Sequence, residues 1–259
     1  MYSILSCICF GYRGELILMP SITITGGGLI GLFCADILSS KHNVTIIEIN
    51  AEIGFPANFP GIISQSNNIS KLLDSAELSN LYIFDTGNQI NFRTEWFVKL
   101  LSHKLAKSKV DIIHRTRIES ILLEKNQLNL QLKGSESNFK TLETDKLIDF
   151  SETLLPGPKG QIHTIEGNLD QIIKPDIPTK QFFVGTCLRN DLINLNKSKI
   201  IIERSDGLAE VWYEVNEKET PKQGWIESKI LNAYYNSKIM TVDDYYKKAQ
   251  DIINTMVIQ

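Results

Sequence analysis

Apolar positions near the start of the chain predict a strand, a helix and a second strand. Residues 21–25 form a short β-branched run, and three consecutive glycines follow it directly. Residues 29–38 then repeat apolar side chains at helical spacing, and residues 44–47 form another β-branched run that ends at Glu48. The pattern therefore predicts strand–helix–strand within residues 20–50, with a glycine turn between the first strand and the helix.

The glycines of this turn have the spacing of a dinucleotide-binding motif. Gly26 would permit the tight turn, Gly28 would let the backbone approach a pyrophosphate, and Gly31 would let the helix pack closely on the strand. The helix N-terminus would offer N–H groups and a partial positive charge to the phosphates. Glu48 would accept hydrogen bonds from the hydroxyls of the adenosine ribose. Because all five parts occur in order, the sequence predicts a dinucleotide-binding fold.

The chain that follows predicts one helix and several strands. Thr94 is the expected N-cap of a helix from Glu95 to about Lys109, which has an apolar face. Segments of β character separated by polar turns predict an antiparallel meander. The meander strands are expected at 117–123, 128–132 and 139–142, and other short strands at 81–84, 89–92, 110–114 and 146–150.

A run of proline and glycine at residues 156–160 predicts a hinge into a second region. Beyond it, segments 182–186, 199–203 and 209–215 predict an antiparallel sheet. The chain from about residue 225 onwards is expected to be helical, with an N-cap at Thr241 and an acidic first turn.

The expected fold is therefore α/β, with a Rossmann-like (FAD/NAD(P)-binding) three-layer ββα domain, a small antiparallel β-sheet region and C-terminal helices. Residues 19–155 would form the nucleotide-binding domain, and residues 156–259 the substrate or partner region. Residues 1–18 are interpreted as an extension that is disordered or not native, because Met19 stands where proteins of this fold commonly begin.

Composition and charge narrow the classes of function. Hydrophobic residues make up 42% and charged residues 22% of the 259 residues, as in ordinary globular proteins. The net charge of −3 gives no reason to expect nucleic-acid binding. The four cysteines show no C-x-x-C pair and the four histidines are scattered, so no metal site is predicted. No run approaches the ~20 apolar residues of a membrane span, so we expect a cytoplasmic protein with at most peripheral membrane contact.

Several segments together resemble a known family. They are the GGGLIG turn with Glu48, the loop at residues 52–64, Phe-Arg-Thr-Glu at residues 92–95, and Thr-Arg-Ile-x-Ser-Ile at residues 116–121. In this order they resemble the FAD-dependent oxidoreductases of the glutathione-reductase-like superfamily, within the aromatic hydroxylase and geranylgeranyl reductase branch. The resemblance covers about residues 20–150.

The resemblance implies FAD as the cofactor, NAD(P)H as a candidate hydride source, and an isoprenoid or aromatic small-molecule substrate. In that family the equivalent of Arg93 lies near FAD, and the backbone at the equivalent of Ile118 faces the adenine. Phe59 stands where the family has a cysteine, so no role of that thiol is carried over. Neither Gly185 nor Gly207 begins the family's later G-D-A motif. We therefore expect FAD to be held weakly, mainly by its adenosine end.

Two classes of function stay open from the sequence. One is an FAD-dependent oxidoreductase, whose chemistry the cofactor would mainly carry, so that no conspicuous acid–base pair is required. The other is a non-catalytic or partner-dependent protein that keeps the nucleotide fold but has lost the second half of the flavin site. A protein partner or a second copy of the chain would supply the missing contacts in that case.

Overall fold

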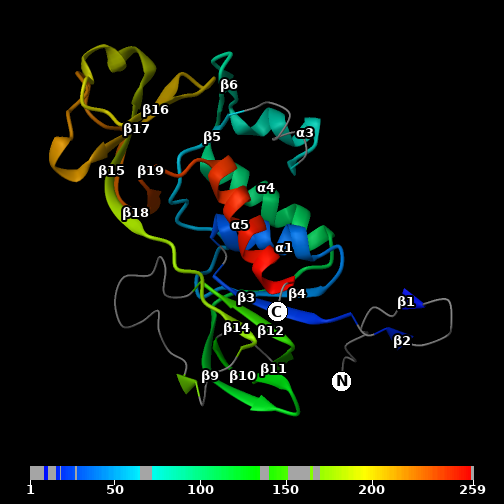
Figure 1. Ribbon diagram of the computed structural model, residues 1–259. Coiled ribbons are helices and arrows are strands. Elements are labelled where there is room, and N and C mark those ends of the chain that lie inside the picture. Colours follow the sequence, from blue (N-terminus) through cyan, green and yellow to red (C-terminus); the bar gives the residue numbers. More distant parts are fainter. Residues whose placement is uncertain are drawn as a thin grey trace. The chain divides into compact units, whose positions relative to one another are not determined.

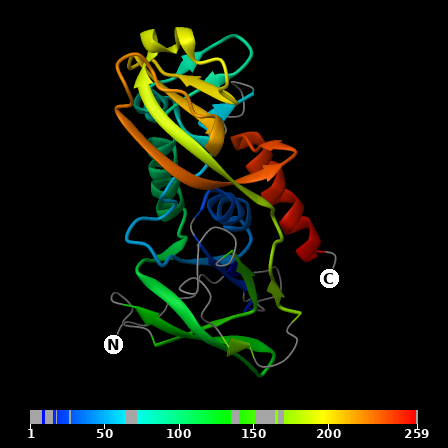
Figure 2. The ribbon, with the colours of Figure 1, turned by 90° about the vertical axis from the view of Figure 1, so that its left-hand side faces the viewer.

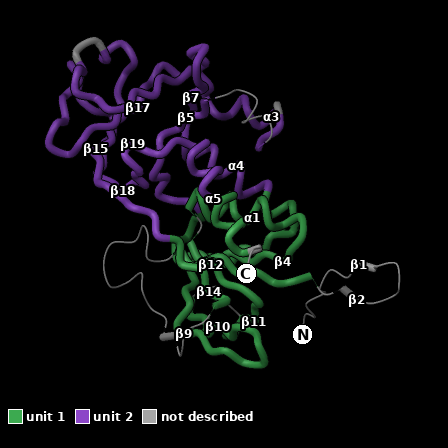
Figure 3. Tube along the Cα trace, in the orientation of Figure 1, with its two compact units in different colours: residues 1–53, 105–175, 250–259 green, residues 54–104, 176–249 purple. Residues whose placement is uncertain are grey.

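The computed structural model describes residues 9–10, 16–17, 19–26, 28–64, 72–134, 140–150, 164–165 and 170–257. The chain divides into two compact units that are each made of several segments (Figure 3). Unit 1 comprises residues 1–53, 105–175 and 250–259, and unit 2 comprises residues 54–104 and 176–249. The expected boundary after residue 155 and the hinge at 156–160 lie outside the described residues.

Unit 1 is built on a five-stranded parallel sheet with the order β14-β12-β3-β4-β8. The central strand β3 is buried on both faces, since Ile22, Thr23 and Ile24 are all almost inaccessible. Such burial is typical of a parallel sheet that is covered on both sides. Helix α1 (Leu29–Leu38) lies on one side of this sheet (Figure 1). The strands are β3 (Ser21–Thr25), β4 (Asn43–Ile47), β8 (Asp111–Ile113), β12 (Lys146–Asp149) and β14 (Ile172–Ile173).

An antiparallel meander covers the other side of the sheet (Figure 1). Its first turn has positive φ at both Lys125 and Asn126, the conformation of a two-residue hairpin turn. A buried aliphatic cluster joins the layers, with Ile47 and Leu147 of the parallel sheet packed against side chains of β9 and β10. The strands are β9 (Thr116–Glu124), β10 (Gln127–Gly134) and β11 (Thr141–Thr144), with β13 (Thr164–Ile165) parallel to β9 and a separate pair of β1 (Cys9–Phe10) and β2 (Leu16–Ile17).

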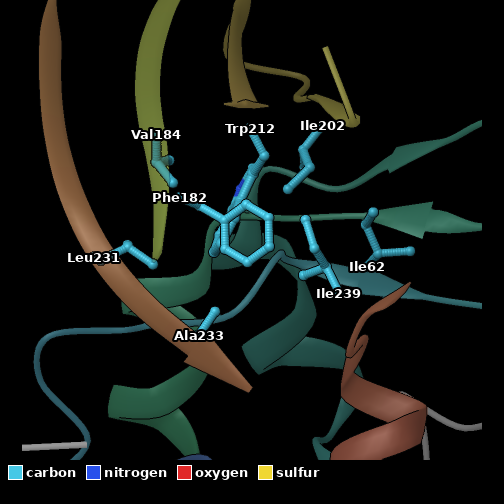
Figure 4. Close-up of a cluster of buried hydrophobic side chains, with 8 residues drawn as sticks. All are labelled: Ile62, Phe182, Val184, Ile202, Trp212, Leu231, Ala233 and Ile239. Carbon is cyan, nitrogen blue, oxygen red and sulfur yellow. The ribbon is translucent and has the colours of Figure 1, made fainter. Parts of the chain in front are cut away.

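Unit 2 contains a five-stranded antiparallel sheet with the order β16-β17-β15-β18-β19. Alternate side chains of β15 pack into two separate hydrophobic clusters, one on each face of the sheet. Phe182 packs with Trp212 on one face, and Phe183 packs with Tyr213 on the other. Figure 4 shows the first of these clusters, to which Ile62 of another sheet also belongs. The strands are β15 (Thr179–Leu188), β16 (Ile200–Glu203), β17 (Leu208–Glu214), β18 (Glu227–Asn236) and β19 (Lys238–Ile239).

A smaller sheet and the longer helices complete the described fold. The sheet has the order β5-β7-β6, and helix α5 begins after Thr241, whose N–H and hydroxyl both bond to Asp244 Oδ2 at 2.9 Å. In the described part of the chain, no helix has the length and apolar character needed to cross a membrane. The elements are β5 (Ile62–Ile63), β6 (Phe84–Asp85), β7 (Ile90–Asn91), α3 (Ser75–Leu78), α4 (Thr94–Lys107), α5 (Val242–Val257) and the 3₁₀ turns Ser79–Leu81, Arg189–Asn194 and Val215–Glu217.

The fold confirms the expected strand–helix–strand of residues 20–50, the meander and the antiparallel sheet of the second region. It corrects three other predictions. Residues 227–239 are strands, not helix, because they pair with β15 and with each other. Thr94 is the first residue of α4 instead of its cap, since the carbonyl of Arg93 accepts the N–H of Phe97. Leu81 belongs to a 3₁₀ turn, so the strand expected at 81–84 begins only at Phe84.

Candidate dinucleotide-binding site

The turn between β3 and α1 is fixed by the backbone of Gly26. This residue has a φ of +91°, which favours glycine, and its N–H donates to the carbonyl of Ile47 at 2.9 Å. A Cβ at Gly26 would also lie 3.3 Å from the Cβ of Phe150. The end of β3 is thereby held against the end of β4 on one side and against the residue that follows β12 on the other.

The two other motif glycines differ in what the fold requires of them. A Cβ on Gly31 would overlap the carbonyl oxygen of Gly26, so only glycine fits the contact between α1 and the turn. Gly28 is the N-cap of α1, with a φ of −59° that any residue adopts. The backbone conformation at Gly28 therefore gives no reason for a glycine there.

The N-terminus of α1 carries no side chain that competes for its N–H groups. No side chain caps it, and its first turn holds no acidic residue. The carbonyl of Gly28 accepts the N–H of Leu32 at 3.0 Å, so the helix begins directly at the turn. An anion at this end would meet unsatisfied N–H groups and the positive end of the helix dipole.

Glu48 follows β4 and is buried, with 4% of its surface exposed. Its Oε1 accepts the backbone N–H of Asn50 at 2.9 Å and the side-chain Nδ2 of Asn50 at 2.8 Å. Since Gly26 bonds to Ile47, the residue before Glu48, the acid stands next to the glycine turn as predicted. Its carboxylate is oriented by these bonds to Asn50, an arrangement that the sequence did not indicate.

A second buried acid lies at the same edge of the parallel sheet. Asp149 ends β12, and its Oδ1 accepts the hydroxyl of Thr25 at 2.6 Å, which ties β12 to β3 just before Gly26. Lys174 Nζ lies 3.8 Å from the other carboxylate oxygen. We did not single out Thr25 or Asp149 from the sequence. The sequence does place a polar residue at the end of each of these two buried strands. The carboxyl ends of parallel strands lie at the same edge of the sheet, which brings such side chains together.

The other two predicted site residues occupy different places. Ile118 lies in β9 of unit 1, where its side chain is buried in the cluster between the meander and the parallel sheet. Arg93 belongs to unit 2, where its Nε lies 3.5 Å from a carboxylate oxygen of Glu95. The expected contacts of Ile118 and Arg93 with a cofactor stay predictions.

A buried thiol and several aromatic rings belong to the hydrophobic cores. Cys34 is fully buried and its burial raises the pKa of the thiol to about 12. Phe59 is buried against the rings of Phe97 and Tyr245. Trp212 and Tyr213 are buried in the two cores of unit 2. None of these aromatic rings is available to a ligand.

The two glycines considered for a second flavin motif have structural roles. Gly207 has a φ of +82° in the hairpin turn between β16 and β17. A Cβ on Gly185 would overlap the ring of Trp225. Among the described residues, no group of histidine, cysteine, aspartate or glutamate side chains is arranged to hold a metal ion.

No protein-family model matches the chain, and no curated protein sequence matches it either. Solved structures share its fold at low sequence identity. The L-α-glycerophosphate oxidase from Mycoplasma pneumoniae, solved with FAD bound, is 12% identical with a TM-score of 0.55. That comparison covers 91% of this chain and 94% of the oxidase.

Two further solved structures have the same fold. The p-nitrophenol 4-monooxygenase PnpA from Pseudomonas putida is 11% identical with a TM-score of 0.53, over 92% of this chain and 80% of PnpA. BexE, studied for oxidation during BE-7585A biosynthesis, is 9% identical with a TM-score of 0.54, over 89% of this chain. The chain spans 60% of the length of BexE. At these identities the likeness establishes a mixed α/β fold shared with oxidases and hydroxylases.

Proposed function

We propose that this chain is an FAD-dependent oxidoreductase with a Rossmann-like nucleotide-binding fold. The observation that carries the proposal is the uncapped N-terminus of α1 at Gly28, beside the buried Glu48. The conformation of Gly28 does not itself require glycine, and room for a pyrophosphate is a physical reason for one. The shared fold with a glycerophosphate oxidase solved with FAD bound supports the same assignment.

The residues of unit 1 fit the adenosine and pyrophosphate part of FAD. The first N–H groups of α1 would bind the pyrophosphate, and Gly26 and Gly31 keep the turn free of side chains. Glu48, oriented by Asn50, would accept hydrogen bonds from the ribose. When bound, FAD would supply the hydride chemistry. With no G-D-A segment in the sequence, we propose weak and exchangeable binding.

We propose a small aromatic compound as the substrate class. PnpA is a p-nitrophenol 4-monooxygenase, and its fold is shared over most of both chains. An isoprenoid substrate, as in geranylgeranyl reductases, is supported only by the sequence resemblance in residues 20–150. For either substrate, NAD(P)H is the proposed hydride source.

The test is the visible absorption of the purified protein, followed by FAD titration monitored by flavin fluorescence. We expect saturable binding, which Gly28→Val abolishes because the branched side chain would occupy the pyrophosphate position. This variant should still fold, since valine adopts the φ of Gly28. Thr141→Val is the control, because Thr141 is exposed in β11 and valine is favourable in a strand. Equal FAD affinity of the wild type and the Gly28→Val protein would contradict the proposal.

One observation favours a second candidate function. The glycines at 185 and 207 serve a ring contact and a hairpin, so neither can cradle the rest of a flavin. A protein that keeps the nucleotide fold but depends on a partner chain would lack these flavin contacts of its own. Saturable FAD binding without reduction of the bound flavin by NADH or NADPH would support this second function over the first.

A further inference from the structure

Strand β18 forms an open edge of the sheet in unit 2. One side of β18 pairs with β15 from residue 227 to residue 234. On its other side, the described residues include only β19, which pairs with Tyr235 and Asn236. Figure 2 shows β18 in orange at the front of unit 2, beside β15 in yellow. An open edge presents backbone N–H and C=O groups that can pair with another strand.

The start of β18 and the residue before it carry the two most exposed large apolar side chains among the described residues. Ile226 and Ile230 are each 59% exposed, more than any other described large apolar side chain. The N–H of Ile226, the residue before β18, donates to the carbonyl of Thr186 at 2.8 Å, which holds Ile226 beside the end of β15. Residues 226–230 are all exposed, whereas Leu231 is buried.

The sequence of this segment is complementary to itself in the antiparallel direction. It reads Ile226-Glu227-Ser228-Lys229-Ile230. If two copies pair about a two-fold axis at Ser228, then Ile226 faces Ile230 of the second copy and Glu227 faces Lys229. Directly opposed residues share a face, so apolar contacts lie on one face of the joined sheet and ion pairs on the other.

Neighbouring registers do not offer this match. An axis at Glu227 would place two glutamates opposite each other, and an axis at Lys229 would place two lysines opposite each other, both destabilising. A slip of one residue would set Glu227 opposite Ile230 and remove both ion pairs. A lysine on an edge strand commonly blocks pairing, but here the register about Ser228 gives Lys229 an opposite charge.

We propose that two copies of this chain associate through their β18 edges, antiparallel and centred on Ser228. The occupant of the edge is therefore a second copy of the protein, and the joined sheet runs continuously through both unit 2 sheets. This interface is isologous, because the same five residues serve both copies. The proposal does not depend on cofactor binding.

The test is the dimer dissociation constant of the full chain, measured by sedimentation equilibrium over a range of concentrations. Lys229→Glu should raise the dimer dissociation constant roughly tenfold or more. In this variant Glu227 of each copy would face a second carboxylate, and the two-fold axis repeats the repulsion. The double variant E227K/K229E exchanges the charges and should restore the wild-type value. A circular dichroism melt establishes that each variant is folded.

A cysteine at the axis gives an independent readout. In a C7S/C9S background, S228C should form a disulfide-linked dimer on mild oxidation, because opposed Cα atoms of paired strands lie within disulfide range. The control S40C places a cysteine at an exposed position of unit 1, outside β18, and should form no disulfide-linked dimer under the same conditions. A wild-type protein that stays monomeric, or a dimer that Lys229→Glu leaves unchanged, would overturn the proposal.

Discussion

Gly31 lies so close to the carbonyl oxygen of Gly26 that a Cβ on Gly31 would overlap this oxygen. Outside Gly26, the nearest atom is Cγ2 of Ile24, at 3.5 Å from that Cβ position. The first turn of α1 is therefore in direct contact with the end of β3 and with the turn that joins them. This contact places the N-terminus of the helix over the carboxyl end of the parallel sheet.

Replacing Gly31 by alanine should destabilise unit 1. Overpacking of a tight contact costs about 1–3 kcal/mol, and the better helix propensity of alanine offsets about 1 kcal/mol of this. Because the overlapped atom is a backbone oxygen, the cost lies at the upper end of this range, and we expect a net loss of about 2 kcal/mol in the free energy of unfolding, measured by urea denaturation. The control is Gln250→Ala, at an exposed helical position of unit 1, which should change the unfolding free energy by less than about 0.5 kcal/mol. A Gly31→Ala protein as stable as the wild type would show that the contact is looser than described.

Replacing Glu48 separates its structural role from its proposed role in binding. Glu48→Gln keeps an oxygen that accepts from Asn50, so the unfolding free energy should change by less than about 1 kcal/mol. Glu48→Ala removes the charged acceptor for the ribose, and FAD binding should weaken by about 1.5–3 kcal/mol. The measurement is calorimetric titration of both variants with FAD. Unchanged affinity of Glu48→Ala would exclude Glu48 from the site.

The local pattern around Gly26 was sufficient to predict the first βαβ element. Each part is specified by neighbours in the sequence: β-branched runs, a glycine that needs positive φ, and a helix that is apolar on most sides. The place of Glu48 followed from the same pattern. The role of Asn50 in orienting its carboxylate did not, because a side-chain hydrogen bond in a loop has no periodicity.

Residues 227–239 show what the sequence could not predict. Lysine, leucine and alanine in this segment favour helix, and the strand forms because β15 offers an edge with matching side chains. The Thr25–Asp149 bond was missed for a similar reason, since it joins residues 124 positions apart. The assignment of residues 54–104 and 176–249 to one unit also depends on such distant contacts.

Tyr245 anchors the first half of α5 within unit 2. Its ring is buried against Phe59 and Tyr234, and its hydroxyl donates to the carbonyl of Asn58 at 3.2 Å. Tyr245→Ala should lower the unfolding free energy by about 3–5 kcal/mol, and Tyr245→Phe by about 0.5–1.5 kcal/mol. The exposed Lys247 provides the control, because Lys247→Ala should cost less than about 0.5 kcal/mol. Equal losses for the alanine variants in denaturant titrations would contradict this packing.

Glu210 is a buried acid on the inner face of the sheet in unit 2. Burial raises its pKa to about 7, and the charge of Glu95 on α4 acts in the same direction. The Nε1 of Trp212 donates to its Oε1 at 2.7 Å, and this bond, together with the positive charges of Lys229 and Arg204, offsets part of the rise. Between pH 4.5 and about 7, Glu210 is therefore protonated in the folded state, whereas in the unfolded chain it would be ionised.

We expect unit 2 to lose stability as the pH rises from about 4.5 to about 7. The contribution of Glu210 is fully present below the unfolded pKa and is lost as its folded pKa is passed, a change of roughly 3 kcal/mol. Glu210→Gln stays neutral, keeps an acceptor for Trp212, and should abolish this part of the pH dependence. Above pH 7 the variant should be more stable than the wild type.

All three tryptophans of the chain lie in unit 2, so their fluorescence during urea unfolding reports on this unit. The exposed Glu143 of unit 1 supplies the matched control, since Glu143→Gln should follow the wild-type profile. Identical profiles for the Glu210→Gln and wild-type proteins between pH 5 and 8 would mean that Glu210 is already ionised in the folded state.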